Sequence, residues 1–219
     1  MDTAVAPNYR HSLVTRVTHG TFGLAFAGLV LTGLQVYLHA HWLSDAVLLH
    51  EIFACVMIVS GVVYVAYAAL TGKLGALFFR SRDVTGLVPM AFYYLKLRPS
   101  PPEFGEYNPL QKLAYTIVLF MLAPLIVATG LAMWPHFGLF RPLAHLFGGR
   151  KAAGLWHLGL ALELVFFFFG HMVMVATTGL RANLRAIVTG YASGPQPSAS
   201  TSLRAGASFD CARARVRVP

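Results

Sequence analysis

The stretch that decides the fold is residues 154–180, GLWHLGLALELVFFFFGHMVMVATTGL, in which apolar and small residues surround two histidines. It is longer than the roughly 20 residues that a helix needs to cross a hydrocarbon core. His157 and His171 lie fourteen residues apart, close to four helical turns, so both leave nearly the same face about 21 Å apart along the axis. Ionisable side chains are costly at membrane depth and are rare there without a function. The stretch therefore predicts a transmembrane helix with one histidine near each side of a bilayer.

Three further apolar runs have the same length, and together they set the fold class. The four expected spans are about 15–38, 46–71, 113–134 and 154–180. The 219-residue chain is 57% hydrophobic and only 11% charged, whereas about a quarter of the residues of a soluble domain are charged. Open strand edges cannot be satisfied in lipid, so every span should be a helix, with a kink at Pro124 in the third. We expect an all-α integral membrane protein, a four-helix transmembrane bundle.

Charge placement predicts the orientation of this bundle. One side carries only Arg141, Arg150 and Lys151. The other fourteen basic residues lie on the opposite side: Arg10, Arg16, Lys73, Arg80, Arg82, Lys96, Arg98, Lys112, Arg181, Arg185, Arg204, Arg213, Arg215 and Arg217. The positive-inside rule places both termini in the cytoplasm. The net charge of +9 is thus a topology signal and does not indicate nucleic acid.

The chain divides into three parts. Residues 1–14 form a short N-terminal cytoplasmic arm, and residues 15–190 form the bundle domain. Residues 191–219 are rich in Ser, Pro, Ala and Arg, a composition typical of a disordered tail.

The histidines predict a pair of haem sites at two depths. With spans one and two running in opposite directions, His19 lies near the cytoplasmic face with His171, and His50 lies near the outer face with His157. Each pair can supply two axial imidazoles to one iron, as in six-coordinate haems that carry electrons. The chain has no C-x-x-C-H motif, so such haems would be of the non-covalent b type.

Other interpretations of these residues stay open. Membrane histidines can also serve only as hydrogen-bonding partners between helices. Glu163, at mid-depth, fits either proton movement or a neutral, hydrogen-bonded carboxyl group. Span one ends in LTGL (31–34) and span three in ATGL (128–131), which is either an internal repeat or small residues that allow close packing.

Several motifs resemble one family. They are RVTHG (16–20), LTGL (31–34), YNPLQKLAY (107–115), TGLAMW (129–134), the H-x₁₃-H spacing of span four, LFGGR (146–150) and NLRAIVTG (183–190). Over about residues 10–190 the chain resembles the dihaem cytochrome b subunits of membrane oxidoreductases. These include the formate dehydrogenase gamma subunit, the nickel–iron hydrogenase b-type cytochrome and the thiosulfate reductase cytochrome b subunit.

The resemblance implies roles for particular residues. The inner haem would be held by His19 and His171, and the outer haem by His50 and His157. A quinone would bind near the cytoplasmic haem, beside Asn108, Gln111 and Lys112. The alternative for that segment is an ordinary Asn-Pro turn with Lys112 as an interfacial anchor.

The function expected is that of an electron-transfer subunit without catalytic residues of its own. It would pass electrons between a periplasmic oxidoreductase, of molybdopterin or nickel–iron type and with or without an iron–sulfur protein, and the quinone pool. It would do so as a multi-pass protein of the bacterial cytoplasmic (inner) membrane, in contact with lipid. One alternative is a stand-alone dihaem quinol oxidase that reduces a small oxidant such as superoxide. Another is a haem-free membrane protein whose histidines bind a metal ion.

Overall fold

The computed structural model describes residues 8–100, 102–104, 107–134 and 138–192. The backbone contacts divide the chain into two compact units. One unit comprises residues 14–180, and the other comprises residues 1–13 and 181–219.

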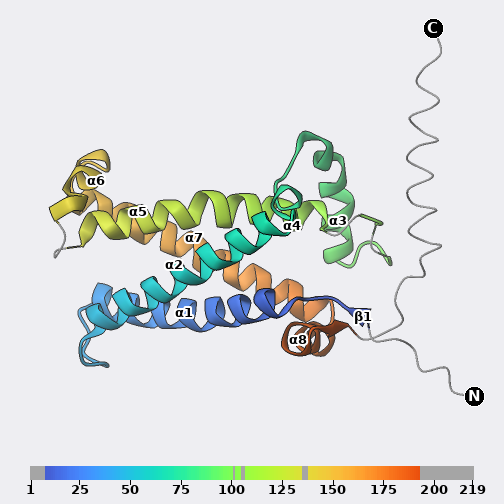
Figure 1. Cartoon of the computed structure of the whole chain (residues 1–219), viewed down its shortest axis with the longest axis horizontal. Helices are drawn as coiled ribbons and strands as arrows, with labels where there is room; N and C mark the ends of the chain where they lie inside the picture. Colours follow the sequence, from blue (N-terminus) through green and yellow to red (C-terminus); the bar gives the residue numbers. More distant parts are fainter. Residues whose placement is uncertain (1–7, 101, 105–106, 135–137, 193–219) are drawn as a thin grey trace, which may run out of the picture. The chain divides into compact units, whose positions relative to one another are not determined.

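Four helices of the larger unit are long and apolar enough to cross a membrane, which confirms the predicted bundle. They are α1 (Leu13–Leu38), α2 (Ala46–Leu70), the continuous helix Pro109–Met133, and α7 (Arg150–Thr177). Figure 1 shows them running side by side. The third and fourth helices begin about four residues earlier than predicted, because polar residues occupy their first turns.

The interior of the unit is narrow and made of small side chains. Buried residues include Ala25, Ala68 and Ala132, and the hydroxyl residues Thr32 and Thr129 are 0% exposed. Large apolar side chains cover the outside instead, as with Phe166, which is 81% exposed in the isolated chain. This inversion is expected where lipid replaces water, because helix association then depends on close backbone packing and not on hydrophobic burial.

The third transmembrane helix is interrupted where the sequence contains Pro124. It consists of α4 (Pro109–Ala114), the π-helical stretch η3 (Tyr115–Leu122) and α5 (Ala123–Met133). Proline has no backbone N–H and its ring clashes with the preceding turn, so the regular bonding pattern cannot continue across it. The wider π turn takes up this mismatch.

Short elements close the two ends of the bundle. At one end lie η1 (Leu74–Ala76), η2 (Ser81–Gly86) and α3 (Leu87–Tyr94). Lys96 then adopts a left-handed conformation (φ 61°) and donates a hydrogen bond from Nζ to the Thr177 carbonyl at 2.6 Å. At the other end η4 (Gly138–Phe140) and α6 (Arg141–Leu146) precede α7.

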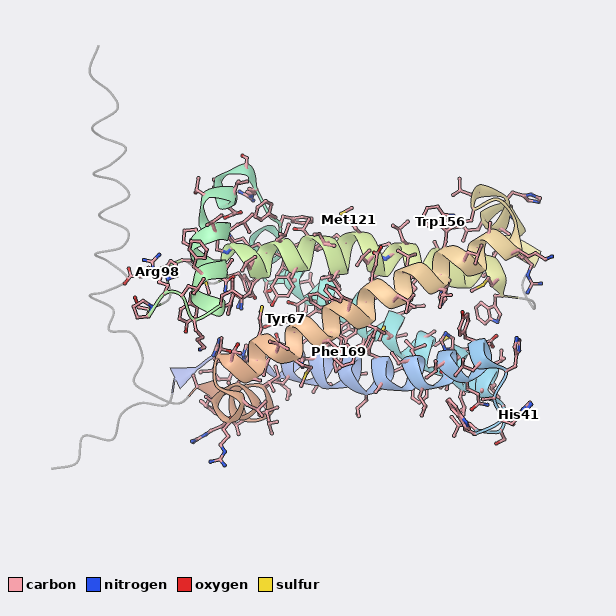
Figure 2. The ribbon with its side chains drawn as sticks, turned by 180° about the vertical axis from the view of Figure 1, so that it is seen from behind. His41, Tyr67, Arg98, Met121, Trp156 and Phe169 are labelled. Carbon is pink, nitrogen blue, oxygen red and sulfur yellow. The ribbon has the colours of Figure 1, made fainter. Side chains whose placement is uncertain are left out.

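His41 and Arg98 lie at opposite ends of the bundle (Figure 2). His41 lies at the end where α1 turns into α2, and Arg98 lies at the opposite end, after α3 (Figure 2). This separation matches the two faces that the charge pattern predicts, and the orientation itself stays a prediction.

The smaller unit contains α8 (Leu180–Thr189), whose first residue belongs to the larger unit, and the pair of two-residue strands β1 (Asn8–Tyr9) and β2 (Tyr191–Ala192). The strands are antiparallel, and the Tyr9 and Tyr191 rings meet edge to face at 5.5 Å. The predicted tail therefore begins with two paired residues. Residues 193–219, for which disorder is expected, lie outside the described residues. Residues 1–7 of the arm also lie outside them.

Candidate functional site: two histidine pairs

The four membrane histidines lie in two pairs at two levels of the bundle. The ring centroids of His19 on α1 and His171 on α7 are 6.1 Å apart, with an interplanar angle of 52°. Those of His50 on α2 and His157 on α7 are 6.3 Å apart, with an angle of 66°. The topology expected from the sequence places the same histidines at the same depth. We call His19 and His171 the inner pair, and His50 and His157 the outer pair, after their predicted sides of the membrane.

A buried threonine fixes the His50 ring. Thr32 Oγ1 donates its only hydrogen to the Gly28 carbonyl at 2.7 Å, as hydroxyl groups in helices commonly do. It lies 3.0 Å from His50 Nδ1 and can therefore only accept there. The hydrogen of the imidazole is thus on Nδ1, which leaves Nε2 with a lone pair for a metal ion.

The same arrangement recurs at His157. Thr129 Oγ1 donates to the backbone carbonyls of Leu125 and Ile126 at 3.0 and 2.9 Å, and it lies 3.0 Å from His157 Nδ1. The Ile126 carbonyl, which can only accept, is also 3.1 Å from this nitrogen. Nδ1 of His157 therefore carries the hydrogen too.

A glycine follows each of these threonines and faces the same imidazole. A Cβ added to Gly33 would lie 3.3 Å from His50 Cε1, and one added to Gly130 would lie 3.3 Å from His157 Cε1. Each separation is shorter than an ordinary carbon–carbon contact, which lies near 3.5–4.0 Å. The Thr32–Gly33 and Thr129–Gly130 dipeptides are therefore two equivalent cradles, one for each ring of the outer pair.

The inner pair has a different environment. Among the residues that the structure describes, neither His19 nor His171 makes a side-chain hydrogen bond. Phe167 stacks near His171 at 6.3 Å with an interplanar angle of 21°.

The three residues assigned to a quinone lie where the third span begins. Asn108 caps α4, since its Oδ1 accepts from Gln111 N at 2.9 Å while Gln111 Oε1 accepts from Asn108 N at 3.0 Å. Asn108 Nδ2 also donates to the Tyr94 hydroxyl oxygen at 3.0 Å. This is a capping box that starts a helix. The capping box uses the side-chain oxygens of both Asn108 and Gln111. The amide nitrogen of Gln111, Nε2, takes no part in it.

Lys112 pairs with an acidic residue that the sequence analysis did not single out. Its Nζ lies 2.8 Å from Asp83 Oδ1, and the two side chains are only 18% and 9% exposed. The hydrogen bond from Lys112 holds the pKa of Asp83 below its ordinary value, helped by the Arg80 backbone N–H, although burial acts in the opposite direction. Lys112 thus anchors the loop after α2 to the start of the third span.

The sequence profile described as prokaryotic cytochrome b561 matches residues 10–190. The chain belongs to this family. An Azospira oryzae protein named "Putative protein-methionine-sulfoxide reductase subunit YedZ1" is 30% identical over 177 residues, covering 74% of this chain and 87% of that protein. "Putative cytochrome YdhU" of Escherichia coli is 34% identical over 91 residues, which are 40% of this chain but only 33% of YdhU. The chain is therefore a cytochrome b561-type membrane haem protein, with b-type haem as its cofactor.

The histidine pairs have the dimensions that such a cofactor requires. Metal–imidazole bonds are about 2.0 Å long, and the ring centroid lies roughly 1.1–1.2 Å behind the bonded nitrogen for ring bonds near 1.33 Å. Two imidazoles on one iron thus have centroids about 6.3 Å apart, against the 6.1 and 6.3 Å found here. The residues present fit a b-type haem at either level.

Two other features of the sequence, Glu163 and the repeated Thr-Gly dipeptide, can also be compared with the structure. Glu163 is exposed in the isolated chain, and neither of its two interpretations is favoured. The repeated Thr-Gly signal contacts the outer histidines, so the two motifs are alike in structure as well as in sequence. Thr32, Thr129 and Asp83 are the residues that the sequence analysis did not assign to the site.

Proposed function

We propose that the chain is the dihaem electron-transfer subunit of a membrane oxidoreductase, linking a periplasmic catalytic partner to the quinone pool across the bacterial inner membrane. The observation that carries the proposal is the pair of imidazole–imidazole separations, 6.1 and 6.3 Å, at the two ends of one helix. In this proposal His19 and His171 hold the inner haem, and His50 and His157 hold the outer haem.

The chemistry follows from having two protein ligands at each level. A b-type haem held by two histidines would carry one electron at a time and would leave no iron position for a substrate. The chain contributes orientation and a dry, apolar surrounding, and substrate chemistry belongs to a partner. The name of the Azospira relative, a subunit of a reductase, supports such a division of labour.

A metal-binding function without haem has less support. A non-haem site for a divalent ion needs several His, Cys or carboxylate ligands that converge on one point. Across the described parts of the chain, no group of three such side chains is placed to hold a metal ion. The histidines are instead arranged as two separate pairs.

A quinone contact at the start of the third span remains part of the proposal, in a narrower form. Asn108 serves the capping box, so the polar atoms left for a quinone carbonyl are Gln111 Nε2 and the remaining hydrogens of Lys112 Nζ. The Lys112→Met and Gln111→Leu variants should therefore slow quinol oxidation while both haems stay bound.

The test is a reduced-minus-oxidised absorption spectrum of the purified full-length chain with a haem-to-protein ratio. We expect two low-spin b-type haems per chain, one of which is lost in His157→Ala and the other in His171→Ala. His41→Ala changes an exposed histidine at one end of the bundle and serves as the control, which should keep both haems (Figure 2). A chain that binds no haem, or loses the same haem in both variants, would refute the proposal.

A further inference from the structure

Both ligands proposed for the outer haem rest on threonine hydroxyl groups, and the inner ligands do not. Thr32 and Thr129 are fully buried, and each lies 3.0 Å from Nδ1 of its histidine. Each hydroxyl group donates to a backbone carbonyl of its own helix, so its lone pairs face the imidazole. The two arrangements come from different helix pairs, α1 with α2 and α5 with α7.

We propose that Thr32 and Thr129 are positioning residues that set the orientation and the electron-donating strength of His50 and His157, and thereby lower the midpoint potential of the outer haem relative to a site without them. This inference rests on the proposed function. In it Thr32 and Thr129 act through the histidines that they contact.

The physical basis is the hydrogen bond on the far side of each ring. When Nδ1–H donates to an oxygen, the ring is held in one orientation and Nε2 becomes a stronger base. A stronger base stabilises the more positively charged, oxidised state of a metal, so the reduction potential falls. The hydroxyl group is itself polarised by its own bond to the helix, and chains of hydrogen bonds strengthen one another.

The competing explanation is that these threonines only help helices to pack. Threonines that bond to the carbonyl of residue i−4 are common in transmembrane helices, and small residues are frequent at helix contacts. Packing depends on shape, which valine reproduces, whereas the Oγ1–Nδ1 bond needs the hydroxyl group. In Thr129→Val only the Ile126 carbonyl, 3.1 Å from His157 Nδ1, would remain to accept from this ring. The two explanations therefore differ in the response to Thr→Val and Thr→Ser.

Thr18 offers a matched control. It is 5% exposed, lies on α1 like Thr32, and donates to the Val14 carbonyl at 2.8 Å. Its hydroxyl group has no recorded bond to a histidine among the described residues. Thr18→Val thus removes the same type of intrahelical bond without changing a histidine contact.

The experiment is a redox titration of the haem-loaded full-length chain in a His171→Ala background, which retains only the outer haem. We expect Thr32→Val and Thr129→Val each to shift the ratio of oxidised to reduced haem at a fixed potential by roughly tenfold towards the reduced form, about 59 mV for a one-electron couple. Thr→Ser at either position should restore the original potential, and Thr18→Val should leave it unchanged. The low-spin electron paramagnetic resonance signal should change in the valine variants alone, because it reports ligand orientation.

Outcomes that contradict the inference are distinct from those that contradict the proposed function. Unchanged potentials and resonance signals in Thr32→Val/Thr129→Val would overturn the positioning role while the dihaem proposal stands. Loss of the outer haem in the serine variants as well as in the valine variants would also overturn it, because serine retains the hydroxyl group. Absence of the outer haem from the chain with unaltered threonines would refute the proposed function and this inference together.

Discussion

The glycines that contact the outer histidines give the sharpest prediction about the site. A Cβ on Gly33 or Gly130 would lie 3.3 Å from the imidazole Cε1, so each ring would have to move by a few tenths of an ångström. A metal–ligand distance tolerates only about 0.2 Å. Valine adds two methyl groups beyond Cβ. The imidazole ring cannot avoid these methyl groups by a movement of a few tenths of an ångström.

The expected effect is a selective loss of the outer haem. Overpacking a tight contact costs about 1–3 kcal/mol. If that cost falls on cofactor binding, affinity drops by about 5- to 150-fold. We expect Gly33→Ala and Gly130→Ala to weaken the outer haem, and Gly33→Val and Gly130→Val to remove it. The inner pair lies about 21 Å away along α7 and should keep its haem in every variant.

The assay is the haem-to-protein ratio together with the redox titration. Gly61→Ala is the control, because a Cβ there would lie at an ordinary 3.5 Å from Phe22. It should retain both haems at their original potentials. Two bound haems with unchanged potentials in Gly33→Val/Gly130→Val would refute the idea that these glycines make room for the ligand rings.

Three other predictions concern the parts that surround the site. The pKa of Asp83 is lower in the folded chain than in the unfolded chain, where it is about 3.9. The pair of Asp83 and Lys112 should therefore stabilise the fold fully at pH values above about 3.9. This stabilisation should be lost as the pH falls through the pKa of Asp83 in the folded chain. Lys112→Met, which leaves a nearly buried charge unpaired, should lower the unfolding free energy at neutral pH by about 3 kcal/mol, and thermal denaturation should show a smaller loss near pH 3. Asn108→Ala should cost about 1 kcal/mol through the lost helix cap, while Asn108→Ser should restore thermal stability, and an equal loss in both variants would contradict the capping role. Gly28→Ala should lower the melting temperature of the haem-loaded chain, because a Cβ there would lie 2.5 Å from the Phe53 ring on α2. A Gly28→Ala chain as stable as the unaltered one would contradict the prediction that the close contact between Gly28 and the Phe53 ring leaves no room for a Cβ.

Much of the fold could be predicted from the sequence because a membrane restricts the choices. Only helices satisfy their own backbone in lipid, so length and hydropathy alone located four spans. The start of the third span was predicted too late, since Gln111 and Lys112 are polar and do not contribute to an apolar run. They nevertheless belong to the helix, because Asn108 and Gln111 cap it and Lys112 is paired with Asp83.

The site was predictable only in part, for a physical reason. Histidines at membrane depth stand out because they are expensive there. Thr32 and Thr129 do not stand out, since a threonine that bonds to its own helix costs little in lipid. Asp83 was missed because a single acidic residue in a polar loop gives no pattern, and its partner lies 29 positions further along the chain.

The repeated Thr-Gly dipeptide shows how a weak sequence signal can point to a site. In each helix pair the first helix supplies the dipeptide and the second supplies the histidine, with the same Oγ1–Nδ1 distance of 3.0 Å and the same glycine contact of 3.3 Å. Packing alone does not require that both contacts recur on an imidazole. The inner histidines come from α1 and α7, and among the described residues neither makes a side-chain hydrogen bond such as the outer ones make with a hydroxyl group. The two histidine pairs therefore differ in their hydrogen bonds. Substitutions at positions 32 and 129 should change the midpoint potential of the outer haem and leave that of the inner haem unchanged.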